Sequence, residues 1–211
     1  MNGLELGVQA LGKRVDAALA DALTALRERD LGLADRVVRA DLEINRLRYA
    51  LEEQASAKLA ETSDPLEVRT LVATLYVLSD LERIGDHAEG IAKVTLMLGP
   101  HPALSIPSVM VTMSQQVQAM VTRTLAALHR RDVDEARRLC GEDDEIDALY
   151  DRAYGELLSA MTGNRDIVSH ATYLLWVTHN LERIADRTTN ICERVVYLVT
   201  GRVEELNVSK Y

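Results

Sequence analysis

The chemistry most clearly suggested by this 211-residue sequence comes from a repeated pair of carboxylates. The string Leu-Glu-Arg-Ile-x-Asp occurs twice, beginning at residue 81 and again at residue 181. Residues four apart share one face of an α-helix, so Glu82 lies beside Asp86 and Glu182 beside Asp186. Like charges at this spacing destabilise an exposed helix by about 0.2–0.5 kcal/mol. A repulsive pair present twice therefore calls for a compensating cation.

Further oxygen ligands occur at a matching register upstream of each pair. Asp41 and Asn45 are four residues apart, as are Asp143 and Asp147, and Glu193 follows the second pair by two helical turns. If the helices that carry them are antiparallel neighbours, each half of the chain gathers about four oxygen side chains. Carboxylates without cysteine suit hard cations such as Mg, Mn or Fe, with Zn a further candidate. The oxygen side chains that this spacing gathers are Asp41, Asn45, Glu82 and Asp86 in the first half, and Asp143, Asp147, Glu182 and Asp186 in the second.

A metal-free interpretation of the same acids is also open. Arg83 and Arg183 lie beside them and could pair with them across helices in an ordinary network of salt bridges. His87 follows the first motif and could be a fifth ligand. Its counterpart in the second motif is Arg187, which cannot bind a metal, and this speaks against the assignment.

Composition indicates which elements must position these side chains. Hydrophobic residues make up 47% of the chain but aromatics only 4%, with no Phe. The core must therefore be built from Leu, Ala, Val, Ile and Met, which favours helices and nearly excludes an all-β fold. With only 11 Gly and 4 Pro, tight hairpins are scarce. Three of the four prolines lie within residues 100–107, which predicts one non-helical connector at mid-chain.

The chain repeats itself across that connector. Residues 29–47 match residues 131–149 at eight of 19 positions, and residues 80–93 match residues 180–193 at six of 14. The offsets of about 100 residues indicate a duplicated domain rather than a solenoid. The predicted fold is all-α, with two tandem antiparallel three-helix bundles. The predicted boundaries are 1–99 and 108–201 for the bundles, 100–107 for the connector and 202–211 for a C-terminal tail.

Six helices are expected, three in each bundle. Asp30, Asp64 and Asp132 are predicted N-caps, and Glu67 and Glu135 follow two of them at the spacing of a capping box. The expected helices run over about 5–28, 31–61, 65–98, from Ser108 to the next cap, from there to Gly163, and over about 166–199. The fourth carries an uncharged stripe that includes Met110, Met113 and Met120. A methionine stripe could bind a partner, but a place in the core is favoured.

Several function classes are disfavoured. The net charge is −9, and no basic patch predicts nucleic-acid binding. The longest uncharged stretch, residues 99–122, contains three prolines and does not predict a membrane span. No signal peptide, phosphate-binding glycine loop or nucleophile signature is recognised, and Cys140 and Cys192 form no CxxC motif. A cytoplasmic protein without enzymatic activity is expected.

The segments DLERIGDHAEGIA and NLERIADRTTNICE resemble the paired signatures of the PhoU family of phosphate-signalling proteins. The resemblance extends over about residues 5–201. It implies a cytoplasmic negative regulator of the phosphate-starvation response and of phosphate uptake. It also implies binding to a sensor histidine kinase and to the ATPase subunit of the phosphate ABC transporter, formation of a homodimer, and metal clusters at the acidic motifs. Carried over by position, the metal ligands that it implies are Asp41, Glu82, Asp86, Asp143, Asp147, Glu182, Asp186 and Glu193.

The first unit departs from this family pattern. The family often continues its motif as Asn-Ile-Ala-Glu, and the second unit retains the acid as Glu193, whereas the first has Lys93. The first unit also has Asn45 where the second has Asp147. Weaker metal binding in the first unit is therefore predicted. A metal-dependent hydrolase or oxidase and a metal-free helical scaffold are the alternatives.

Overall fold

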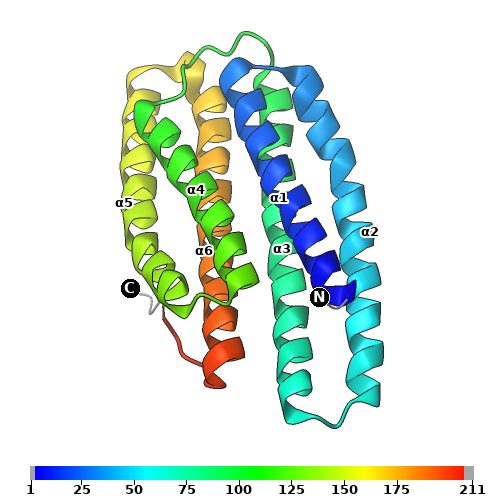
Figure 1. Ribbon diagram of the computed structural model, residues 1–211. Helices are drawn as coiled ribbons and strands as arrows, with labels where there is room; N and C mark the ends of the chain where they lie inside the picture. The colour runs from blue at the N-terminus through cyan, green and yellow to red at the C-terminus, as the bar shows by residue number, and fades with distance from the viewer. Residues whose placement is uncertain (1–2, 207–211) are drawn as a thin grey trace.

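The computed structural model describes residues 3–206, and within that range the chain is almost entirely helical (Figure 1). It has six long α-helices and one short 3-10 helix, without strands in the described part. The elements are α1 (Gly3–Glu28), α2 (Leu31–Glu61), α3 (Pro65–Leu98), α4 (Ser108–Arg130), α5 (Val133–Gly163), η1 (Arg165–Ile167) and α6 (Val168–Thr200).

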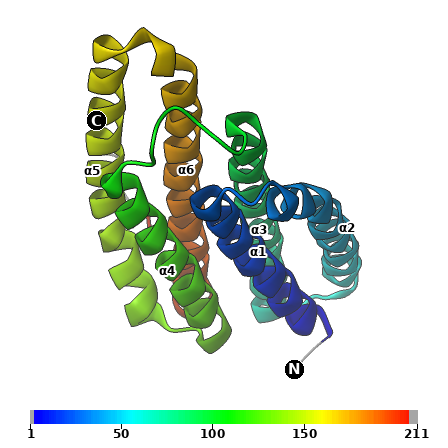
Figure 2. The same ribbon diagram turned by 90° about the horizontal axis from the view of Figure 1, so that it is seen from above.

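The helices form two bundles side by side. Helices α1, α2 and α3 pack against one another, as do α4, α5 and α6. In the view of Figure 1 the first set runs up, down and up, and the second runs down, up and down. The bundles meet where α3 lies against α6, with a smaller contact between α1 and α4 (Figure 2). The two views show α2, α3, α6 and α5 in one layer, with α1 and α4 crossing its front face. The predicted all-α fold of tandem bundles is confirmed.

Local sequence signals explain where these helices begin and end. The side chains of Asp30, Asp64 and Asp132 each accept a hydrogen bond of 2.8–3.1 Å from a backbone N–H two or three residues on, as N-caps do. Helices α3 and α6 end at Gly99 and Gly201, which have φ of 68° and 75°. Residues with a Cβ rarely adopt these angles, so glycine is the suitable terminator there.

The contacts of two capping glutamates and the start of one helix differ from the predictions. Glu67 accepts a hydrogen bond from the Thr62 hydroxyl at 2.6 Å, and Glu135 pairs with Arg123 and Arg138. Neither glutamate is therefore seen to complete a capping box. Helix α6 also starts at Val168 rather than near 166, because a 3-10 turn precedes it.

The core is aliphatic, as the composition predicts. Its largest fully buried side chains are Leu, Ile and Met, without an aromatic residue among those described. Met110, Met113 and Met120 are at most 2% exposed, so the methionine stripe of α4 belongs to the core. Cys140 and Cys192 are buried free thiols. None of the described helices is long and apolar enough to cross a membrane.

The junction between the bundles contains polar pairs at equivalent positions of the duplication. On α3 and α6, residue 80 corresponds to 180 and residue 87 to 187. The carboxylate of Asp80 lies 3.7 Å from the guanidinium of Arg187. At the related place, the ring Nδ1 of His87 lies 3.0 Å from the amide oxygen of Asn180. The two pairs thus lie at equivalent positions of the duplication, but one is an ion pair and the other is an uncharged hydrogen bond.

The equivalent positions 90 and 190 also lie in this junction, and they too differ in polarity. Asn190 donates a hydrogen bond of 3.3 Å to Asp80. Its counterpart is Gly90, where a Cβ would lie 2.9 Å from the amide oxygen of Asn180. Contacts this short are essentially never seen for real Cβ atoms, so the glycine lets α6 approach here.

Candidate metal centres

The first acidic cluster lies between α2 and α3. Burial, followed by the charges of Glu89, Asp86 and Glu82, raises the pKa of Asp41 to about 6, so carboxylates from the two helices lie near one another. Burial and the charge of Asp86 also raise the pKa of Glu82. Desolvated like charges hold protons, or attract another cation in their place.

A small residue lets α2 approach α3 at this cluster. A Cβ at Gly85 would lie 3.2 Å from Cγ2 of Ile44 and 3.7 Å from Oδ1 of Asp41. The second unit has Ala185 at the equivalent position. The glycine inside the motif thus brings the α2 carboxylate against α3.

Two oxygens of the first cluster have no hydrogen-bond donor within the described chain. Asn45 donates its amide to Oδ2 of Asp41 at 2.7 Å. The other carboxylate oxygen of Asp41 and the amide oxygen of Asn45 are buried and make no hydrogen bond. A buried acceptor without a partner costs about 1–3 kcal/mol. These two oxygens fit the ligand set of a hard cation.

The second cluster lies between α5 and α6 at the equivalent place. Burial, followed by the charge of Asp186, raises the pKa of Glu182 to about 7, with smaller contributions from Asp147 and Asp143. Burial and the charge of Asp186 also raise the pKa of Asp147. Asp143 itself is only 3% exposed. The acids predicted from α5 and α6 are therefore brought together.

One oxygen of the second cluster is also without a hydrogen bond. It is the buried Oε2 of Glu182, whose ion-pair contacts are Arg183 Nε at 3.6 Å and His179 Nδ1 at 3.7 Å. Both distances are too long for hydrogen bonds. The oxygen therefore remains available to a stronger cationic partner.

The arginine of each motif pairs within its own helix rather than across helices. Arg83 lies 3.3 Å from Asp86, and Arg183 lies 3.2 Å from Asp186. Both arginine side chains are more than 40% exposed, so these ion pairs are screened and contribute at most about 1 kcal/mol each. They offset the clustered negative charge only in part.

Glu193 and Lys93, the residues at which the motifs diverge, are both engaged. Glu193 accepts a hydrogen bond of 3.0 Å from the backbone N–H of Leu206 and lies 3.6 Å from Arg194. Lys93 forms an ion pair of 2.6 Å with Glu89 and lowers the pKa of Asp41 slightly, so a fixed cation lies near the first cluster. The structure gathers the other seven predicted ligands into two clusters and holds Glu193 against the C-terminal segment.

The donor chemistry of the clusters fits a hard cation, although their side chains do not yet converge. Within residues 3–206, no three carboxylate, imidazole or thiol groups are placed to hold one ion as they stand. Side-chain rotation would be needed to bring them onto a common point. The orphan oxygens of Asp41, Asn45 and Glu182 are the groups that such a rotation would satisfy.

Sequence reasoning missed the polar junction between the bundles. The signal was present, because Asp80 and Arg187 carry opposite charges while their counterparts, Asn180 and His87, can share a hydrogen bond. Position 80 corresponds to 180 and position 87 to 187, and each residue is complementary to the counterpart of the other. This pattern indicates a contact between the two copies. His87, considered as a fifth ligand, lies in this junction.

Comparison with known proteins gives one family. The model of the PhoU domain matches residues 8–95 and 110–195. The chain is 33% identical over 200 residues to the phosphate-specific transport system accessory protein PhoU homolog of Clostridium acetobutylicum, covering 93% of this chain and 91% of the relative. It is 34% identical over 202 residues to the homolog of Caulobacter vibrioides, covering 94% and 86%.

Two solved structures have the same fold. The crystal structure of PhoU from Pseudomonas aeruginosa superposes with a TM-score of 0.90 at 32% identity, covering 94% of this chain and 96% of that one. The phosphate transport system regulatory protein PhoU from Streptococcus pneumoniae gives 0.89 at 30% identity, covering 96% of each chain.

Proposed function

Since the chain belongs to the PhoU family, we propose that it is a non-enzymatic negative regulator of phosphate uptake and of the phosphate-starvation response. The observation that carries this proposal is the agreement over both bundles with a protein described as a regulator of the phosphate transport system. The near-complete coverage of both chains supports a shared role rather than a shared module.

The proposed mode of action is binding. In the cytoplasm, a homodimer of the protein would contact a sensor histidine kinase and the ATPase subunit of the phosphate ABC transporter. Tyr76 and Trp176 occupy equivalent positions of α3 and α6 and are 56% and 48% exposed, which supports a role in contacts with partners. Regulation requires partners to be bound with different affinity in phosphate-replete and phosphate-starved states.

The proposed metal ions would be held by the two carboxylate clusters. The ligands would be Asp41, Glu82, Asp86, Asp143, Asp147, Glu182 and Asp186. A bound divalent or trivalent cation would supply positive charge to each cluster and join two helices of a bundle. The orphan oxygens described above are the support for this assignment.

Affinity capture from cells grown with high and low phosphate tests the regulatory proposal. The tagged full-length protein is expected to recover the transporter ATPase and the kinase, in amounts that change with phosphate supply. Cells lacking the protein are expected to take up more phosphate. Recovery of neither partner under any phosphate condition, together with unchanged uptake, would contradict the proposal.

A further inference from the structure

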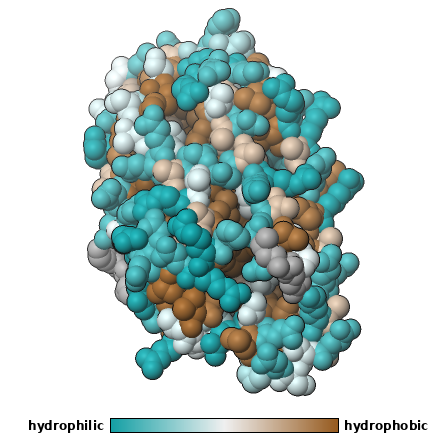
Figure 3. Space-filling model, in the orientation of Figure 1, coloured by the Kyte–Doolittle hydropathy of each residue, from teal (hydrophilic) through white to brown (hydrophobic). Residues whose placement is uncertain are grey.

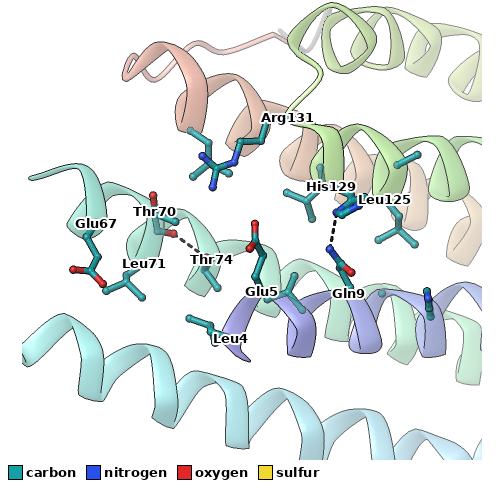
Figure 4. Close-up of a pocket in the computed structure, with 16 residues that line it drawn as sticks. Leu4, Glu5, Gln9, Glu67, Thr70, Leu71, Thr74, Leu125, His129 and Arg131 are labelled. Carbon is teal, nitrogen blue, oxygen red and sulfur yellow. Dashed lines mark hydrogen bonds between the residues drawn. The ribbon is translucent and has the colours of Figure 1, made fainter. Parts of the chain in front are cut away.

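A cleft lies where the two bundles meet (Figure 4). Helices α1 and α3 of the first bundle and α4 and α6 of the second form its walls, with a volume of about 480 Å³. Figure 3 shows hydrophobic side chains reaching the surface among polar ones on the face that α1 and α4 cover. The apolar walls are formed by Leu4, Val8, Leu71, Leu125, Leu128 and Leu198.

Most of the polar groups at this cleft are accounted for by the protein itself. Glu5 and Glu67 lie in the first turns of α1 and α3, where the partial positive charge of a helix N-terminus stabilises a carboxylate. Glu67 also accepts a hydrogen bond from Thr62. His129 and Gln9 share a hydrogen bond of 2.5 Å across the cleft.

Two cations at the cleft are not accounted for in this way. The side chains of Lys13 on α1 and Arg131 at the end of α4 are exposed and line the cleft. Neither forms an ion pair or a side-chain hydrogen bond with any residue in the described range 3–206. The lining therefore combines an apolar body with two acids and two bases, and the two basic side chains are held in no ion pair within the described range.

The duplication places a second cleft, of about 380 Å³, at the other end of the crossing between α1 and α4. Its lining includes Thr24 of α1, Met110 of α4 and Ile106, which comes from the 100–107 connector. The chain itself thus covers part of the second cleft with an aliphatic residue from an extended segment. The described lining of the first cleft comes from helices and their ends, without a residue of the connector.

We propose that the first cleft is a binding site for a small amphipathic organic anion. The apolar body would lie between α1, α3 and α4, and the anionic group would bind Lys13 and Arg131. The volume falls within the range of about 300–1,000 Å³ that small-molecule pockets occupy. Such a ligand would contact both bundles at once. The site does not depend on the regulatory role proposed above.

Two fluorescent probes test the apolar and the anionic parts separately. 8-Anilinonaphthalene-1-sulfonate has an aromatic body with a sulfonate, and N-phenyl-1-naphthylamine has the same body without charge. The folded, full-length protein is expected to bind the sulfonate at one saturable site per chain. The neutral probe is expected to bind about tenfold more weakly, since hydrogen bonds to charged groups are the stronger ones.

Matched variants locate the site. Thr74→Phe places a ring in the first cleft, and Thr24→Phe makes the same change in the second cleft. Thr74→Phe is expected to abolish binding of the sulfonate, while Thr24→Phe leaves it within twofold. Arg131→Gln and Lys13→Gln are each expected to weaken the sulfonate about tenfold without changing the neutral probe. Circular dichroism and Tm serve as checks of folding for all four variants.

Several outcomes would overturn the proposal. Loss of the sulfonate site in Thr24→Phe rather than Thr74→Phe would move it to the second cleft. If Arg131→Gln and Lys13→Gln bound the sulfonate as tightly as the parent does, the two cations would not bind an anionic group. No probe binding by the parent, with an altered oligomeric state in Thr74→Phe, would mean that a second copy of the chain covers the cleft.

Discussion

Asp41 and Glu182 are carboxyls that burial and neighbouring acids make reluctant to ionise, with pKa values of about 6 and 7. They lie in equivalent clusters but at non-equivalent positions, since Asp41 corresponds to Asp143 and Glu182 to Glu82. In the first cluster an α2 acid has its pKa raised to about 6, and in the second an α6 acid has its pKa raised to about 7.

This shift sets the direction of the pH dependence of the metal-free protein. A raised pKa in the folded state means that the folded chain binds more protons than the unfolded chain between about pH 4 and pH 7. The stabilising contribution is therefore full below about pH 4 and is lost as pH rises through 7. In the presence of a chelator, Glu182→Gln is expected to have a free energy of unfolding about 1–2 kcal/mol higher than the parent at pH 8, and the same as the parent at pH 4. Urea unfolding at both pH values measures the difference. An equal shift for Glu156→Gln, an exposed acid of α5, would contradict this reasoning.

Metal content separates the two clusters. Glu182→Ala is expected to lose more bound metal than Glu82→Ala, because Lys93 already supplies a cation near the first cluster. Elemental analysis of protein purified without chelator measures the loss per chain, with Glu156→Ala as the control. Equal losses from both cluster variants would show that Lys93 and Asn45 do not weaken the first unit. No metal in the parent would favour the metal-free scaffold.

The clustered acids could be predicted because spacing and duplication fix their helical faces. Glu193 shows that sequence spacing does not predict tertiary contacts. It follows Asp186 by two turns and so belongs to the same column of the helix, but the backbone N–H of Leu206 occupies its carboxylate. That contact depends on how the C-terminal segment folds back, which no local pattern encodes.

Helix ends are the elements that the sequence predicts best, since a cap needs only its own few residues. Asp30 caps α2 by accepting from Leu33 N at 2.8 Å. Asp30→Ala is expected to lower the free energy of unfolding by about 1 kcal/mol and Tm by about 2–4 °C. Urea and thermal unfolding measure the change. Asp21→Ala, at an exposed position within α1, should stay within about 0.5 kcal/mol, and a cost equal to that of Asp30→Ala would mean that the cap is not its cause.

The capping boxes were harder to anticipate than the caps. Glu67 and Glu135 have the required spacing, but each bonds elsewhere, to Thr62 in one case and to Arg123 and Arg138 in the other. A long side chain such as glutamate can reach several hydrogen-bond donors. Tertiary neighbours decide that choice, so a local motif predicts the cap more reliably than its reciprocal bond.

At the scale of the whole molecule, the junction of α3 and α6 is the larger of the two contacts between the bundles. Asp80 is held by both Arg187 and Asn190, and burial raises its pKa. Arg187→Met would leave this carboxylate with a weaker set of partners, and we expect a loss of about 1–3 kcal/mol. The same change beside Asp80→Asn should cost less. A double-mutant cycle in urea measures the coupling, and a value near zero would show that the pair is only a surface contact.

The tandem arrangement itself was predictable, because the repeat, the prolines of the connector and the aliphatic composition agree. The side-by-side packing of α3 on α6 was not predicted, since each unit could also have been a separate domain on a linker. The crossed complementarity of Asp80 with Arg187 and of His87 with Asn180 is the part of the sequence that carries this information.

That crossed junction gives the two halves separate identities. A pair of first units would place Asp80 against His87, and a pair of second units would place Asn180 against Arg187, so neither reproduces the salt bridge that the chain makes with itself. The molecule is in this sense a heterodimer whose subunits share one polypeptide. The 100–107 connector also keeps one half near the other at a high effective concentration. Fragments divided there would be expected to choose each other over their own kind.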